Sequence, residues 1–197
     1  DKIAVLSEDN LVTTAFYEIL SGRDTDFTGT IKWGITITPT DMPMDNSSYF
    51  EGNSENLIDW LRNYTTKPDS DEQFIRGFLG KMLFSGEEVM KKVSVLSGGE
   101  KMRCMFSKMM LQGANFLIFD EPTNHLDLES ITALNNGMAD FKGSMLFTSR
   151  DHELTETVAN RIIELTPNGI IDKLMTYDEY INSDVVKAQR EEMYKIK

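Results

Sequence analysis

A four-residue apolar run, Phe116–Phe119, leads directly into two carboxylates, Asp120 and Glu121, and this junction limits the possible folds most strongly. A short strand that is apolar on both faces is typical of the middle of a parallel sheet, where helices cover both sides. In open α/β sheets, ligands bind at the carboxyl ends of the strands. The junction therefore predicts a central parallel strand that presents two acids at the binding edge of an α/β protein.

The segment before this strand predicts a capped and buried helix. Ser97-Gly98-Gly99-Glu100 has the S-x-x-E form of a capping box, which marks a helix start. Two glycines there leave backbone N–H groups open to an anion, which the helix dipole also attracts. A stripe of apolar side chains at helical spacing follows until Gly113, formed by Met102, Met105, Phe106, Met109 and Met110. We expect a phosphate-contacting helix start on a helix packed in the core.

The N-terminal part of the chain predicts a strand, a loop and a helix, and then further strands. Residues 2–6 form a strand-like run, and residues 13–20 have a helical pattern that Gly22 closes. Residues 28–38 place β-branched and aromatic side chains at alternating positions, which favours strands, until Pro39 interrupts the pattern.

The C-terminal part continues the alternation of helices and strands. It predicts a helix over 128–141, a strand over 145–148, a helix after Asp151, and a hairpin that pairs 161–165 with 170–175. Such alternation is typical of a doubly wound parallel sheet flanked by helices.

Residues 41–95 differ in character and predict an acidic helical insertion. Residues 41–72 hold eight acids and two bases, and two apolar clusters follow helical spacing, at 57–61 and at 74–83. The predicted organisation is one α/β core over 1–40 and 96–183, a helical subdomain over 41–95 within it, and a tail over 184–197. Because Asp1 leads directly into a strand pattern, we expect the chain to be part of a longer protein.

Composition excludes several classes of function. The net charge is −12, from 20 bases and 32 acids, which disfavours strong direct binding of nucleic-acid phosphates. No apolar stretch approaches the ~18 residues of a spanning helix. The single cysteine, Cys104, allows no internal disulfide, so we expect a reducing, cytoplasmic setting. His125 and His152 lack partners at zinc-ligand spacing, so we expect no zinc site.

The segment Leu96–Glu100, followed twenty residues later by Asp120-Glu121-Pro122-Thr123-Asn124-His125-Leu126-Asp127, resembles the nucleotide-binding domain of ABC ATPases. Asn124-His125 after Glu-Pro-Thr, and residues 79–86, are similar to the ABC-F subfamily. The resemblance implies a P-loop NTPase-like fold in a soluble tandem-domain ATPase, of the kind that often works on the ribosome. This chain would be the second, C-terminal of the two domains.

The resemblance also implies roles for individual residues. Ser97–Glu100 would contact the γ-phosphate of ATP held on the sister domain, and Asp127 would lie at the interface between the two domains. Asp120 would hold Mg²⁺ directly or through water. Glu121 would orient and deprotonate the attacking water.

The phosphate-binding loop departs from the family pattern G-x-x-x-x-G-K-[ST]. The aligned segment runs from Ser7 through Asn10 to Thr14, with Ser7 and Val12 at the glycine positions and Thr13 at the lysine position. Thr14 keeps the hydroxyl that would touch Mg²⁺. Losing the lysine removes a charge-assisted bond worth roughly 1.5–3 kcal/mol. The loop is therefore either a working nucleotide site or a relic, and the sequence leaves both open.

Two further positions also differ from the family. The glutamine expected after the strand near Ile37 is Pro39, which carries no amide side chain, and the switch histidine is Arg150, which can still contact a γ-phosphate.

The sequence leaves three candidate functions open: a working ATPase half-site, a silent module that only donates its signature to the sister domain, and an ABC transporter subunit. Asn124-His125 disfavours the third.

Overall fold

The computed structural model describes residues 1–43, 45–65 and 71–195, which fall into two compact units. The first, here called the sheet unit, comprises Asp1–Asp41, Asn115–Pro122 and Lys142–Lys197. The second, here called the helical unit, comprises Met42–Ala114 and Thr123–Phe141. In the described ranges, no helix is both long and apolar enough to cross a membrane.

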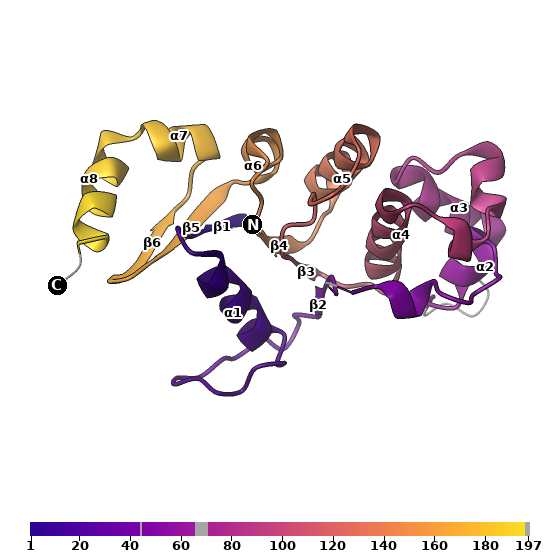
Figure 1. The fold of residues 1–197 in the computed structure, drawn as a ribbon, viewed down its shortest axis with the longest axis horizontal. Coiled ribbons are helices and arrows are strands. Elements are labelled where there is room, and N and C mark those ends of the chain that lie inside the picture. The colour runs from indigo at the N-terminus through magenta and orange to yellow at the C-terminus, as the bar shows by residue number, and fades with distance from the viewer. Residues whose placement is uncertain (44, 66–70, 196–197) are drawn as a thin grey trace. The chain divides into compact units, whose positions relative to one another are not determined.

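The sheet unit contains a six-stranded sheet in the order β2-β3-β4-β1-β5-β6 (Figure 1). Neighbouring strands are parallel except for β5 and β6, which form an antiparallel hairpin. This confirms the predicted α/β class, including the hairpin. The strand bounds are β1 Lys2–Leu6, β2 Pro39–Asp41, β3 Phe116–Phe119, β4 Ser144–Phe147, β5 Arg161–Thr166 and β6 Gly169–Lys173.

The apolar run Phe116–Phe119 lies between β2 and β4, as its composition predicted. Leu117 pairs with Met145 in register, and both side chains are fully buried. Because β3 and β4 are parallel, their carboxyl ends meet at one edge, which brings the residues after Phe119 beside those after Phe147.

The strands predicted over residues 28–38 are wrong, because this segment forms turns and irregular backbone. A strand needs a ladder of backbone hydrogen bonds to a neighbour. Among the described residues, the backbone bonds from this segment to the neighbouring chain are confined to the Thr38 carbonyl, which accepts the N–H groups of Asn115 and Phe116. Trp33 instead packs edge-on against Phe116 at 5.2 Å between ring centroids, whereas Ile35 is fully exposed. Pro39, expected after a strand at the glutamine position, is the first residue of β2, where an edge strand tolerates its missing N–H.

Helices cover both faces of the sheet, with α1 (Asn10–Leu20) on one and α6 (His152–Val158) on the other (Figure 1). A core cluster of Ile3, Val5, Tyr17, Ile118 and Leu146 packs α1 onto β1, β3 and β4. At the C-terminus, α7 (Tyr177–Asn182) and α8 (Asp184–Met193) follow the hairpin. The segment predicted as a tail is therefore helical over most of its length.

The helical unit is built from α2 (Leu57–Arg62), α3 (Glu72–Lys81), α4 (Gly98–Leu111) and α5 (Leu128–Asp140), with short 3-10 turns at Ser47–Tyr49, Gly86–Met90 and Val93–Val95. The predicted apolar positions Leu57, Leu61, Ile75 and Leu79 are fully buried. Cys104 of α4 is also fully buried, and burial raises the pKa of its thiol well above the ordinary value. The thiol therefore stays protonated and unreactive while the unit is folded.

Candidate functional site

Three chain segments meet at the carboxyl edge of β3 and β4 in the sheet unit. Asp120 accepts a hydrogen bond from the Thr148 hydroxyl at 2.7 Å on one carboxylate oxygen. Its other oxygen accepts the Thr14 hydroxyl at 3.4 Å. The backbone N–H of Glu121 donates to the Thr148 hydroxyl oxygen at 2.9 Å. The predicted residues Thr14, Asp120 and Glu121 are thus brought together, and Thr148 links them.

Glu121 sits in a strained and partly desolvated position. Its φ of 48° is left-handed, which is uncommon for a residue with a side chain and often marks functional sites. Burial raises the pKa of Glu121, an effect that the backbone N–H of Arg150 at 3.2 Å and the Arg150 guanidinium only partly offset. A carboxylate with a raised pKa is a better proton acceptor, which suits a general base.

Arg150, at the switch position, lies directly beside this acid. Its Nε is 3.8 Å from a carboxylate oxygen of Glu121, and its side chain is largely exposed. Because most of the guanidinium side chain is in contact with solvent, it can turn toward an incoming anion.

Tyr17 is a site residue that sequence reasoning missed. Its hydroxyl is buried, with no hydrogen-bond partner in good geometry among the residues the structure describes. Burial, and then the negative charge of Asp120, raises the pKa of this phenol, so it remains a donor beside the carboxylates. The only signal in the sequence is its position three residues after Thr14, on the same face of α1.

The phosphate-loop segment forms a capped helix start rather than an open anion cradle. Asp9 is the N-cap of α1, and its carboxylate accepts the backbone N–H of Leu11 at 2.9 Å. Thr13, at the lysine position, is buried and donates its hydroxyl to the carbonyl of Asn10 at 2.8 Å. Val12 is half-exposed. Of the loop residues, only Thr14 reaches the carboxylates.

A cavity of about 240 Å³ in the sheet unit joins this loop to the carboxyl edge. Ser7, Asn10 and Thr13 line it on the loop side, and Glu121 and Arg150 line it on the sheet side. A third wall comes from the C-terminal segment, through Glu164, Tyr177, Tyr180, Ile181 and Arg190. No sequence motif indicated that this last wall belongs to the site.

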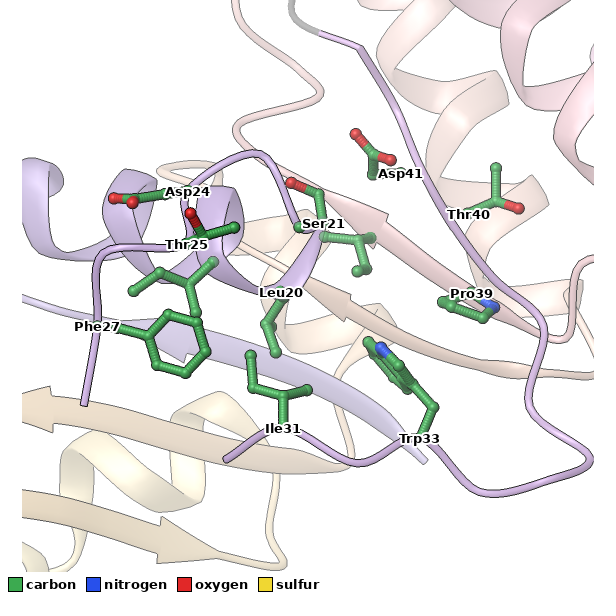
Figure 2. Close-up of a pocket in the computed structure, with 13 residues that line it drawn as sticks. Leu20, Ser21, Asp24, Thr25, Phe27, Ile31, Trp33, Pro39, Thr40 and Asp41 are labelled. Atoms are coloured by element: carbon green, nitrogen blue, oxygen red, sulfur yellow. The ribbon is translucent and has the colours of Figure 1, made fainter. Parts of the chain in front are cut away.

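A second hollow of about 350 Å³ lies beyond the other end of α1 and contains none of the predicted site residues. Figure 2 shows Leu20, Phe27, Ile31 and Trp33 around one apolar space, with Asp24 and Asp41 at its rim. The coil at residues 22–38 therefore packs through its apolar side chains although it forms no strand.

The signature segment in the helical unit adopts the predicted capping box. The Ser97 hydroxyl accepts the N–H of Glu100 at 3.2 Å, and the Glu100 carboxylate accepts the N–H of Ser97 at 2.8 Å. Lys91 pairs with the same carboxylate at 2.8 Å. Burial raises the pKa of Glu100, but Lys91 and the Ser97 N–H outweigh it and hold the pKa below its usual range.

The two glycines of this segment serve different purposes. A Cβ at Gly98 would meet nothing within 4 Å, so the backbone there is open to an approaching group. A Cβ at Gly99 would lie 2.2 Å from the Ser130 hydroxyl oxygen. Gly99 therefore allows close packing of α4 against α5, whose N-cap is Asp127, with its carboxylate accepting the Ser130 N–H at 2.8 Å.

Together, the parallel sheet, the paired acids after β3 and the capped glycine-containing helix start define an ATPase-type nucleotide-binding domain. A family model described as ABC transporter matches residues 13–124, which is more than half of the chain. The chain therefore belongs to the ABC family of ATP-binding domains.

Known proteins similar to this chain agree with that assignment. The Bacillus subtilis protein YkpA, described as an uncharacterized ABC transporter ATP-binding protein, is 60% identical over 98% of this chain and 36% of its own length. The Escherichia coli (strain K12) energy-dependent translational throttle protein EttA is 26% identical over 95% of this chain and 35% of its own. The chain thus spans about a third of these relatives.

A solved structure titled RNase-L Inhibitor shares the fold. Its TM-score is 0.68 at 19% identity, and the match covers 100% of this chain and 44% of that chain.

Proposed function

We propose that this chain is an ATP-binding and ATP-hydrolysing domain of an ABC-F type protein, working as half of a composite nucleotide site with a sister domain. The hydrogen-bonded set of Thr14, Asp120, Thr148 and Glu121 carries the proposal. It combines a hydroxyl at the start of α1 with two acids at the carboxyl end of the buried strand β3, which is a site-building arrangement.

Mg²⁺ and ATP fit this set chemically. One carboxylate and one hydroxyl, Asp120 and Thr14, suit Mg²⁺, which usually keeps several waters and takes few protein ligands. The buried hydroxyl of Tyr17, lacking a partner in good geometry among the described residues, is a donor for such a water. When bound, the ion neutralises charge on the phosphates. Glu121 orients and deprotonates the attacking water, and Arg150 faces the same cavity.

The helical unit contributes the second half of the proposed function. Gly98 leaves the start of α4 open, and Ser97 and Glu100 fix its backbone through the capping box. We infer that Ser97–Glu100 meets the phosphates of ATP held by the sister domain, where the helix dipole favours an anion. Asp127 lies at the start of the adjoining helix α5.

A silent interaction module is the second candidate, and the phosphate loop favours it. The carboxylate of Asp9 already caps α1, and Glu8 adds another acid to the cavity wall. In this alternative, the chain keeps its fold and donates only its signature to the partner.

We further propose a cytoplasmic role linked to translation. The relative EttA is by its printed name a translational throttle protein. With a net charge of −12, this chain is expected to contribute little direct binding to ribosomal RNA or tRNA, so such contacts would fall to other parts of the full protein.

Glu121→Gln separates the two candidates. In the protein at its full natural length, we expect it to lower ATP turnover at the site that contains Glu121 by about 100-fold or more while ATP still binds there. Glu153→Gln is the matched control, because Glu153 is an exposed acid on α6 of the same unit. Unchanged turnover in Glu121→Gln would establish the silent module instead.

A further inference from the structure

A buried carboxylate gathers three donors on the C-terminal wall of the cavity. Glu164 of β5 is 2% exposed. It accepts hydrogen bonds from the Tyr180 hydroxyl at 2.5 Å and the Tyr194 hydroxyl at 2.9 Å. The Nε of Arg190 donates to both of its oxygens, at 2.8 and 3.0 Å. A buried acid with a full set of donors fixes the side chains around it.

Arg190 is held at only one of its nitrogens. Its two terminal nitrogens make no hydrogen bond with the residues the structure describes, and its side chain is 40% exposed. The residue lines the same cavity as Ser7, Asn10 and Thr13 of the phosphate loop. The guanidinium therefore keeps donors available on the wall that faces the altered loop.

We propose that Arg190 supplies, from α8, the cation for the nucleotide phosphates that the phosphate loop lacks. The inference rests on the proposed function, since it names a binding residue of that site. A guanidinium matches phosphate oxygens with paired donors and does not lose its charge. Thr13, at the lysine position, cannot replace it, because its hydroxyl is bonded to the Asn10 carbonyl.

The two cations of the cavity lie on different walls. Arg150 is on the sheet side, 3.8 Å from Glu121, and Arg190 is on the C-terminal wall beside Glu164; the remaining acid of the lining is Glu8. The hydroxyls of Tyr180 and Tyr194 donate hydrogen bonds to Glu164 and so stabilise its negative charge together with Arg190. Burial, and then Glu164, raises the pKa of Tyr194 to about 12, so this donor stays protonated at neutral pH.

Arg190→Gln is the central test, made in the full-length protein with two probes, Mg-ATP and inorganic tripolyphosphate. We expect both to bind about 10- to 100-fold more weakly, the loss of one charge-assisted contact. Arg190→Lys should retain part of the affinity. Lys187→Gln is the matched control, because Lys187 lies on the same helix outside this cavity and, among the described residues, pairs with the exposed Asp184 and the Asn182 carbonyl.

Glu164→Gln distinguishes a phosphate contact from a merely structural role. Removing the acid frees the guanidinium and makes the cavity more positive, so binding of both probes should stay equal or tighten. A structural role predicts that Glu164→Gln and Arg190→Gln weaken binding alike. The double variant, which leaves no unpaired buried charge, should bind as weakly as Arg190→Gln alone.

A composite protein has two nucleotide sites, so a titration can show two classes of binding. Thr14→Ala identifies the class that belongs to this chain's phosphate loop, and Arg190→Gln should weaken that same class. If that class binds normally in Arg190→Gln, the inference is overturned while the proposed function stands. If the wild-type protein has no binding class sensitive to Thr14→Ala, the inference fails together with the half-site on which it rests.

Discussion

The starts of α1 and α4 differ in the charge of the group that caps their unpaired backbone N–H groups. Each helix has unpaired N–H groups and a positive dipole end at its first turn. In α1, the Asp9 carboxylate meets those groups, and the half-exposed Val12 follows. In α4, a neutral hydroxyl from Ser97 caps the helix, and the open backbone of Gly98 follows. The start of α4 is therefore open to an outside anion, whereas the start of α1 already meets a carboxylate of the chain itself.

The largest expected effect separates the two glycines of α4. Gly99→Ala places a methyl group against Ser130, so we expect the free energy of unfolding to fall by about 1–3 kcal/mol. Gly98→Ala has open space and a better helix former, so it should leave stability unchanged or raise it by no more than about 1 kcal/mol. Urea denaturation of both variants is the measurement. Equal losses would show that both glycines serve packing.

A smaller effect concerns the pH dependence of two carboxylates. The lowered pKa of Glu100 means that its ionised form stabilises the fold above its ordinary value of 4.5, and this is lost as the pH falls through the lowered pKa. Glu100→Gln should therefore cost about 1 kcal/mol at pH 7, and the loss should vanish in acid.

Glu121 should behave in the opposite way, because its pKa is raised by burial. Its ionisation destabilises the fold, with the full cost present above the raised pKa and none below 4.5. Glu121→Gln should thus raise the melting temperature at pH 7, with no gain in acid. Thermal melts from acid to neutral pH test both signs, and a gain from Glu100→Gln at pH 7 would contradict the capping geometry.

The smallest effect concerns the α1 cap itself. Asp9→Ser keeps a capping oxygen, so we expect stability to change by less than about 0.5 kcal/mol. Removing the acid should strengthen Mg-ATP binding by about 2- to 5-fold, because a negative charge no longer occupies the helix start. Calorimetric titration measures this, and Asp24→Ser offers a comparison at an acid beyond the other end of α1. Weaker binding in Asp9→Ser would mean that the acid helps the loop.

Local sequence patterns predicted those parts of the fold that depend on interactions between residues close together in the chain. The apolar run Phe116–Phe119 and the capping box at Ser97 are confirmed, because burial on both faces and first-turn hydrogen bonds are properties of a few neighbouring residues. The strands expected over 28–38 failed because alternation cannot show whether a partner strand is present.

The parts of the site that could not be predicted depend on distant segments. Gly99 was interpreted as a phosphate contact, yet its need for glycine comes from Ser130 on another helix. Arg190 had no motif at all, since its importance depends on β5, α8 and the loop meeting around one cavity. Tyr17 likewise could not be assigned to the site from the sequence, because its role depends on the fold that brings Asp120 close to it.

The burial of Cys104 gives this protein a built-in reporter of opening. The sequence contains one cysteine, and its side chain is inaccessible within α4. An alkylating reagent can modify it only when the helical unit opens, so the labelling rate of the native protein measures the opening free energy of that unit alone. If nucleotide bridges the signature and a sister domain, added Mg-ATP should slow the labelling of Cys104 itself.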